Sequence, residues 1–320
     1  MQEIEVFYTY LMSQQTAQHY LLNCYKEIDG IDAEKKSYEN CTTFMSYLEH
    51  GKLFYKSGDN ASPILQPVLY FYGMAHLIKA CLLTVRPDYP ESTSLLAHGV
   101  TARKRKKKDY SFLNDEIKLQ HNGLFPYFSE HLFQIKRYPF EKITMKQLLS
   151  LIPEMKHIFH FNGDEGLYRV GKKNGTWLEF PHAILDDYHT TKDSFLKKIT
   201  PYIPEIKHVE VDNAYIRVEL IQQLRDIKGP FYTDTSQTSI YFPASKEVYL
   251  PFSEVMIHYL LLYNLSMLCR YETEWWGDLF TSKPEVDYPF ITQFLKESAA
   301  KVPFLLGLEL YKKRGGGFFG

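Results

Sequence analysis

The sequence predicts an α+β fold that is mainly helical, with helices at both ends of the chain and a small antiparallel β insertion in its middle third. Apolar residues recur at helical spacing before residue 153 and after residue 253, and apolar and polar residues alternate in three stretches between them. The 320 residues are 45% hydrophobic and 16% aromatic, which suffices for a packed core and excludes a largely disordered chain.

Two helices are expected near the N-terminus. The first covers Phe7–Lys26 and is ended by the turn signal Asp29-Gly30. The second covers Ser37–Tyr47, and the loop that follows it contains Gly51.

A third helix is expected over Ile64–Val85. Ser62 is a good N-cap residue, Pro63 suits a first helical turn, and Pro87 ends the helix because proline cannot continue the hydrogen-bond ladder. Apolar residues lie on most faces of this helix, so we expect it to be buried.

Further helices are expected after residue 146. They cover Gln147–Ile152 with Pro153 as its stop, Glu254–Cys269, Pro289–Ala299 and Val302–Tyr311.

The middle third contains three stretches with strand periodicity. They are Gly166–Phe180 around Asn174-Gly175, His208–Leu220 around Asp212-Asn213, and Ser239–Leu250 around Pro243–Lys246. Apolar and polar residues alternate on both sides of each turn signal, which is the pattern of a β-hairpin. We therefore expect a small antiparallel sheet.

These elements predict four regions. Residues 1–153 form an N-terminal helical domain with a basic loop, and residues 154–252 form a β-rich middle region. Residues 253–311 form a C-terminal helical region that packs on the first domain, and residues 312–320 form a flexible tail.

Charge and cysteine usage predict a cytoplasmic protein without cofactor or metal. The net charge of -1 gives no overall attraction to nucleic acid or to a membrane. The N-terminus lacks the basic and apolar regions of a signal peptide, and the two most apolar segments contain polar residues that a bilayer span disfavours. The four cysteines have no zinc-site spacing, and the glycine motifs that bind nucleotide phosphates do not occur.

The most conspicuous local feature is a run of six basic residues: Arg103, Lys104, Arg105, Lys106, Lys107 and Lys108. Clustered cations attract phosphates through Coulomb forces and counterion release. His98 lies just upstream and Tyr110 just downstream, and their rings offer stacking surfaces beside the cations. We regard these eight residues as a candidate phosphate or polyanion site. The alternative is a solvated loop that binds nothing.

Histidines supply a second candidate. His76 lies in the expected buried helix, four residues after Tyr72 and three before Lys79, so these side chains share one flank. If the segments converge, His76, Lys79 and His121 form a pocket with a titratable base. The alternatives are a hydrogen-bonded core histidine at His76 and turn residues at His98 and His121.

The adjacent Trp275 and Trp276 follow the Glu254–Cys269 helix and are flanked by charged residues. Exposed tryptophans are typical of partner surfaces, which makes the pair a candidate interaction site. The alternative is a pair at the edge of the core, with one ring inside and the other partly outside.

Residues 67–125, PVLYFYGMAHLIKACLL through HNGLF, resemble the YaaC family of Gram-positive bacteria, and residues 258–276, HYLLLYNLSMLCRYETEWW, match a second signature of that family. The resemblance covers essentially the whole chain. It implies a cytoplasmic protein without a securely established activity, whose gene commonly neighbours that of IMP dehydrogenase. This neighbourhood points to purine-nucleotide metabolism.

A weaker resemblance, at the level of the fold, is to the helical HEPN superfamily, which contains ribonucleases and nucleotide-binding partners. It rests on the aromatic-rich helix YFYGMAHLIKACLL and the His98-Gly99 turn after it. In the nuclease signature of that superfamily, four to six residues separate an arginine from a histidine on one helix. Here eleven residues separate Arg86 from His98, which argues against nuclease activity.

Together these observations favour a non-enzymatic binding or regulatory protein. In the most concrete version it is a partner of IMP dehydrogenase or another purine-nucleotide enzyme, and the basic loop binds phosphate-bearing ligands. The alternatives are a HEPN-like ribonuclease or nucleic-acid-binding protein, with His98 or His121 as the base, and a structural protein without a ligand.

Overall fold

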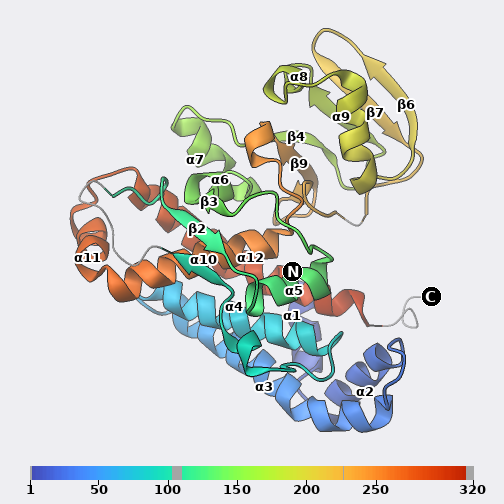
Figure 1. Cartoon of the computed structure of the whole chain (residues 1–320), viewed down its shortest axis with the longest axis vertical. Coiled ribbons are helices and arrows are strands. Elements are labelled where there is room, and N and C mark those ends of the chain that lie inside the picture. The colour runs from blue at the N-terminus through green and yellow to red at the C-terminus, as the bar shows by residue number, and fades with distance from the viewer. Residues whose placement is uncertain (1, 103–109, 226, 315–320) are drawn as a thin grey trace. The chain divides into compact units, whose positions relative to one another are not determined.

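The computed structural model describes residues 2–102, 110–225 and 227–314 (Figure 1). The chain divides into two compact units by its internal contacts. Unit 1 contains Met1–Tyr110, Glu116–Lys142 and His258–Gly320, and unit 2 contains Ser111–Asp115 and Ile143–Ile257. The first is helical and the second holds the larger sheet, so the predicted α+β class, with helices at both ends and antiparallel strands between them, is confirmed.

Unit 1 begins with two helices, α1 (Gln2–Tyr10) and α2 (Gln14–Tyr25), where the sequence predicted one over Phe7–Lys26. The single helix was wrong because Ser13 caps α2. Its backbone is extended and its hydroxyl accepts a hydrogen bond from the Thr16 amide, which starts a new helix there.

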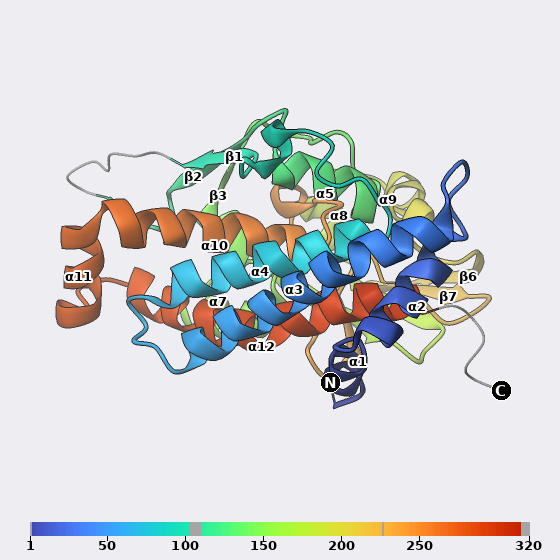
Figure 2. The same ribbon diagram turned by 90° about the horizontal axis from the view of Figure 1, so that it is seen from below.

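Helix α3 (Ala33–Asp59) is much longer than the predicted Ser37–Tyr47 and includes Gly51, for which the sequence predicted a loop. A Cβ at Gly51 would lie 2.6 Å from Leu77 Cδ2 of helix α4 (Gln66–Leu83). A Cβ at Gly58 would lie too close to the ring of Tyr70, at 2.4 Å from its Cε1. These glycines let α3 and α4 pack closely side by side (Figure 2). They are packing residues within a helix, not turn residues.

Helix α4 begins two residues later than predicted, at Gln66, so that Pro67 and not Pro63 occupies its first turn. The prediction that it is buried on most faces is confirmed, because twelve of its eighteen residues are buried. It ends at Leu83, ahead of Pro87.

Three helices close unit 1: α10 (Glu254–Tyr271), whose residues from His258 onward belong to this unit, α11 (Thr273–Ser282) and α12 (Asp287–Lys312). The sequence predicted two helices in place of α12, which instead runs through Pro303. Residues on both sides of this proline are buried against α1 and α4, and the Pro303 carbonyl accepts a 2.8 Å hydrogen bond from the Tyr8 hydroxyl. Tertiary packing thus outweighs the local cost of the proline.

The remaining elements of unit 1 are a 3₁₀ turn, a pair of short strands and one helix. After the 3₁₀ turn η1 (Thr93–Leu96), β1 (Val100–Ala102) pairs antiparallel with β2 (Glu116–Leu119). Helix α5 (Leu124–Phe133) follows.

Unit 2 is built on a six-stranded antiparallel sheet of order β6-β7-β5-β4-β9-β8. Its strands are β4 (Leu167–Lys172), β5 (Trp177–Pro181), β6 (Ile206–Val211), β7 (Tyr215–Leu220), β8 (Tyr232–Thr233) and β9 (Ser239–Pro243). The first two predicted hairpins are confirmed as β4–β5 and β6–β7. The third was wrong: β9 pairs with β4 and β8, and the chain after it forms the 3₁₀ turn η4 (Lys246–Val248).

Short helices complete unit 2. They are α6 (Met145–Leu149), η2 (Pro153–Met155), α7 (Lys156–Phe161), α8 (Ile184–Asp187), α9 (Lys192–Ile199) and η3 (Thr200–Tyr202), and strand β3 (Lys142–Thr144) precedes them. Helix α6 starts two residues before the predicted Gln147, because Thr144 and Gln147 form a reciprocal capping box.

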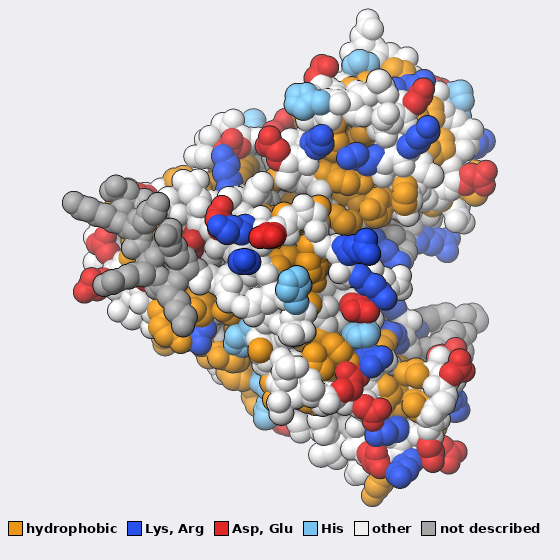
Figure 3. Space-filling model, viewed as in Figure 1, with side chains coloured by type: hydrophobic (Ala, Val, Ile, Leu, Met, Phe, Trp, Pro, Cys, Tyr) orange, Lys and Arg blue, Asp and Glu red, His pale blue; other side chains and the backbone are white. Residues whose placement is uncertain are grey.

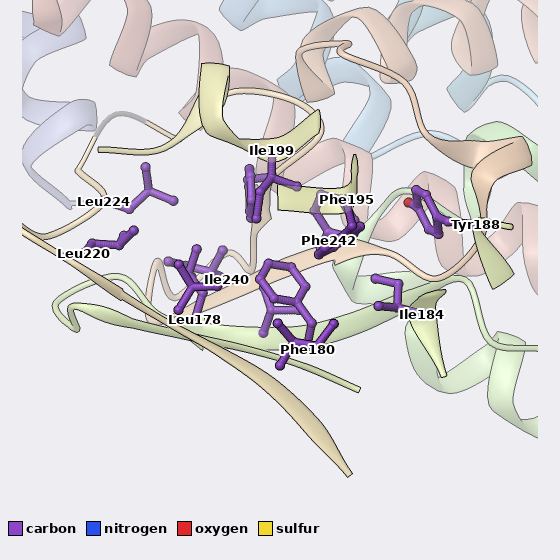
Figure 4. Close-up of a cluster of buried hydrophobic side chains, with 14 residues drawn as sticks. Leu178, Phe180, Ile184, Tyr188, Phe195, Ile199, Leu220, Leu224, Ile240 and Phe242 are labelled. Atoms are coloured by element: carbon purple, nitrogen blue, oxygen red, sulfur yellow. The ribbon is translucent and has the colours of Figure 1, made fainter. Parts of the chain in front are cut away.

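The core of unit 2 lies between one face of its sheet and helices α8 and α9 (Figure 4). Phe180 of β5 and Phe242 of β9 meet Phe195 of α9 with ring centroids 5.1 and 5.9 Å from it. Along β5, Leu178 and Phe180 are buried whereas Trp177 and Glu179 are exposed, which is the alternation that the sequence shows.

Candidate functional site

The predicted basic loop cannot be placed, because Arg103–Lys108 lie outside the described residues. The chain enters this segment from β1, directly after His98-Gly99, and is described again from Tyr110. The candidate site is therefore built from the residues on both sides of the segment and from the helices that they contact.

His98 is the centre of these contacts. Its ring centroid lies 5.0 Å from that of Phe71, 6.3 Å from that of Tyr72 and 5.4 Å from that of Tyr263. Its carbonyl accepts hydrogen bonds from the Tyr259 hydroxyl and the Phe125 amide. The turn before the basic segment is thus fixed against α4, α5 and α10.

His76 is the second centre, one helical turn from Tyr72 on α4. Three rings of α3 surround it, with centroid distances of 5.9 Å to Tyr47, 5.4 Å to His50 and 5.6 Å to Phe54. Lys79 continues the same flank, with its Nζ 5.8 Å from the Tyr47 centroid. The prediction that Tyr72, His76 and Lys79 share one flank of a helix is confirmed.

These contacts form one connected surface of unit 1, which we call the histidine face. It consists of Tyr47, His50, Phe54, Tyr72, His76, Lys79, His98, Tyr263 and Arg270. Arg270 stands seven residues after Tyr263, as Lys79 stands seven after Tyr72, so each helix carries an aromatic ring and a cation two turns apart, although Tyr263 is buried.

His76 differs from the expected core histidine. It is half-buried, and its Nδ1 is enclosed without a hydrogen-bond partner among the described residues. Burial, together with the charges of Lys79 and His50, lowers the pKa of His76 to about 4. The ring is therefore neutral at neutral pH and keeps an unused hydrogen-bonding atom.

The two cations of the histidine face act on His98. Burial lowers the pKa of His98, and the charges of Arg270 and then Lys79 lower it further. Neither cation has an ion-pair partner in the described part of the chain: Arg270 donates to the Ser266 carbonyl, and burial lowers the pKa of Lys79. Two half-buried cations without carboxylates favour an anion nearby.

His121 does not join this arrangement. It is exposed before α5, and no hydrogen bond or ring contact connects it to His76 or His98 within residues 2–102 and 110–314. Of the residues predicted for that pocket, His76 and Lys79 lie on one flank of α4, where His50 contacts His76, and His121 lies apart from them. Tyr263 and Arg270 act on His98 instead. No local pattern in the sequence identifies Arg270, because its effect on His98 depends on the packing of segments far apart in the chain.

The tryptophan pair straddles the core boundary, as the alternative interpretation predicted. Trp276 is 1% exposed, so it contributes no surface to a partner site. Trp275 is half-buried and packs edge-on against Tyr110, with centroids 4.8 Å apart. Tyr110, the second residue after the basic segment, is therefore held on α11.

A further cluster of ionisable groups was not expected from the sequence. Both oxygens of Glu91 accept hydrogen bonds from the Tyr127 hydroxyl, at 2.7 and 2.6 Å, and Arg86 Nη2 lies 2.6 Å from Glu91 Oε1. The ring of His131 packs 4.4 Å from that of Tyr127. Because each charge has its partner, this cluster connects the segment after α4 to α5 and needs no ligand.

Two kinds of site are not found. Among the described residues, no group of three or more His, Cys, Asp and Glu side chains is placed to hold a metal ion. In the same part of the chain, no helix has the length and apolarity that crossing a membrane requires. On the face seen in Figure 3, acidic and basic side chains are intermingled over α2 and the beginning of α3.

Comparison with known proteins bears on the resemblance noted in the sequence. No curated protein and no solved structure matches the chain. A family described as YaaC-like Protein matches residues 9–310, which include both stretches that carry the resemblance. The HEPN superfamily is not among these findings. Since the match spans nearly the whole sequence, the chain belongs to the YaaC-like protein family.

Proposed function

We propose that the chain is a binding protein that takes a phosphate-bearing ligand at the histidine face. The observation that carries this proposal is the pair of half-buried cations, Lys79 and Arg270, which both act on His98 and have no carboxylate partner among the described residues. A phosphate supplies the missing negative charge, and charged hydrogen bonds to it are strong.

The aromatic rings of the face suit the rest of a nucleotide. Tyr72 and Phe54 lie at its half-buried edge, with centroids 6.1 Å apart, and planar bases stack on such rings. The basic segment begins five residues after His98. Only four residues separate His98 from Arg103, and we propose that Arg103–Lys108 add charge to the same ligand.

The test is calorimetric titration of the protein with GTP, with ATP and with a single-stranded RNA. Lys79→Ala and Arg270→Ala should each weaken binding by about tenfold or more, because a hydrogen bond to a charged group contributes about 1.5–3 kcal/mol. Lys142→Ala is the matched control, since Lys142 is also in unit 1 but pairs with Glu116 at 3.2 Å. Equal affinities for all three variants contradict the proposal.

The resemblance to the YaaC family suggests what such binding is for. We propose that the ligand-bound protein regulates a purine-nucleotide enzyme, with IMP dehydrogenase as the partner. The chain added to IMP dehydrogenase should change the rate or the nucleotide sensitivity of that enzyme, and coupling energies of about 1–3 kcal/mol correspond to effects of about 5- to 150-fold. Arg270→Ala should abolish the effect of nucleotide on this regulation. An unchanged rate and nucleotide sensitivity of IMP dehydrogenase would contradict this choice of partner. The proposal that the histidine face binds a phosphate-bearing ligand would not be affected.

A ribonuclease is the second candidate, because Arg270 brings a cation into range of His98 from another helix. A neutral imidazole within the electrostatic influence of a guanidinium is suited to removing a proton beside a phosphodiester. RNA cleavage that disappears in His98→Ala, together with no effect on the dehydrogenase, favours this candidate over the regulatory one.

A further inference from the structure

Unit 1 contains a cavity of about 410 Å³ that shares no residue with the histidine face. It is lined by α1, by α2 and by the end of α12. This volume lies in the range of small-molecule sites, about 300–1,000 Å³. The cavity is within one unit, and the contacts of its lining residues define which ligand it suits.

Four of the nine lining residues are phenylalanine or tyrosine. Phe7 is at the base, with its centroid 5.8 Å from that of Tyr20 and 5.2 Å from that of Tyr311, both edge-on. Tyr10 is stacked beside Phe7 at 6.4 Å and is 54% exposed, so one of its faces is open at the rim. Rings in this arrangement favour a planar ligand that stacks on them.

The charged groups of the cavity compensate one another. Arg314 Nη1 donates a 2.6 Å hydrogen bond to the Tyr311 hydroxyl, and that hydroxyl donates to Glu3. The guanidinium carbon of Arg314 also lies 4.1 Å from the Tyr311 ring centroid. Because a charged ligand would have to break this chain of contacts, the cavity suits an uncharged one.

One polar group of the lining has hydrogen-bonding capacity left. The Asn23 amide nitrogen bonds to His19 Nε2 at 3.2 Å, and the described residues offer this amide no other partner. Its carbonyl and its second N–H therefore remain available to the cavity. An amide in this state pairs with a group that carries a donor and an acceptor side by side, as asparagine does with adenine.

We propose that this cavity binds an uncharged planar heterocycle of up to bicyclic size, which stacks on Tyr10 and presents a lactam-type N–H and C=O edge to Asn23. The proposal is independent of the proposed function. It assigns a second, uncharged ligand to a different set of helices.

Titration with inosine tests the proposal, because its base is a bicyclic lactam without charge. Tyr10→Ala should weaken inosine binding by about 5- to 150-fold, since stacking of a base on an aromatic side chain contributes about 1–3 kcal/mol. Tyr38→Ala is the matched control: Tyr38 is 64% exposed on α3, does not line the cavity, and should leave the affinity unchanged.

The lactam edge is tested with 1-methylinosine, in which a methyl group replaces the N–H. The wild-type protein should bind it more weakly than inosine, whereas Asn23→Ala should bind the two equally. Both Asn23 and Tyr10 are at the rim, so folding of the variants is checked by circular dichroism and urea unfolding. No binding of inosine to the wild-type protein, or equal binding to wild type and Tyr10→Ala, overturns the proposal.

Discussion

The indole nitrogen of Trp276 donates a 2.9 Å hydrogen bond to the carbonyl of Ile64. The two residues are more than 200 positions apart, and the bond attaches α11 to the segment that precedes α4. The same carbonyl accepts from Cys269 Sγ at 3.1 Å. The last residues of the loop before α4 are thus held by α10 and α11, and the buried Trp276 supplies one of the two donors.

Trp276→Phe should reduce the free energy of unfolding by about 1–3 kcal/mol, because the Ile64 carbonyl loses its stronger donor and the smaller ring leaves space in the core. Trp275→Phe is the control. Trp275 is half-buried and its indole nitrogen has no hydrogen-bond partner in the described part of the chain, so this change should stay within about 0.5 kcal/mol. Urea unfolding of both variants checks the difference, and equal losses contradict it.

Substitution of two glycines by alanine should change the stability in opposite directions. A Cβ at Gly307 would lie 2.3 Å from Ile4 Cγ2 and 2.8 Å from Tyr8 Cε2, and both of these side chains are buried. Gly307→Ala should therefore cost about 1–3 kcal/mol.

Gly277 of α11 has no atom within 4 Å of the same position. Gly277→Ala should raise stability by about 0.5–1 kcal/mol, because alanine loses less backbone entropy in a helix. Thermal and urea unfolding measure both variants. A stabilised Gly307→Ala would show that the two helices separate easily.

Local signals in the sequence predict some elements of the fold and mislead about others. The periodicity of α4 and the turn signals of the β4–β5 and β6–β7 hairpins are local features, and the predictions that rest on them are confirmed. Gly51 and Pro303 are local breaking signals that the fold overrides, since their helices continue where buried neighbours hold them. The break at Ser13 is the opposite case, in which one capping hydroxyl divides an otherwise helical pattern.

The sequence predicted those parts of the candidate site that lie close together in the chain. Tyr72, His76 and Lys79 are close in sequence, so helical geometry alone places them on one flank. That Arg270 acts on the ring of His98 depends on the packing of two segments far apart in the chain, which composition and spacing do not reveal. The unpaired state of Lys79 is likewise a property of the folded surface.

The lowered pKa of His76 predicts a dependence of stability on pH. The unfolded chain binds a proton below about pH 6.5, the usual pKa of histidine, whereas the folded chain does so only below about 4. The contribution to stability is therefore fully present above pH 6.5 and is lost as the pH falls toward 4.

His76→Phe removes this dependence and keeps a ring against Phe54. At pH 8 the variant and the wild type should differ little. At pH 5 the variant should gain about 1 kcal/mol relative to the wild type, a value reduced by solvent screening because His76 is half-buried. Urea unfolding at the two pH values measures the gain. A difference that is the same at both would mean that His76 keeps an ordinary pKa in the folded protein.

The basic segment gives the last prediction. Replacing Arg103, Arg105 and Lys107 by alanine should weaken binding of a single-stranded RNA and flatten its salt dependence. Each phosphate contact on a single strand contributes about 0.7 to the slope of log affinity against log salt, so three lost contacts reduce that slope by about 2. The melting temperature should hardly move, because the sequence predicts a solvated loop here and surface substitutions usually change stability by less than about 0.5 kcal/mol.

The triple variant also tests whether the segment and the histidine face bind one ligand. If they do, the combination of the triple variant with Arg270→Ala should lose less binding free energy than the sum of the two separate losses. A ligand that no longer contacts one of the two groups is also held less well by the other. Strictly additive losses would assign the cations and the histidine face to two different ligands. An RNA affinity and salt slope that the triple variant leaves unchanged would remove Arg103–Lys108 from the site, and the anion would then be held by Lys79 and Arg270 alone.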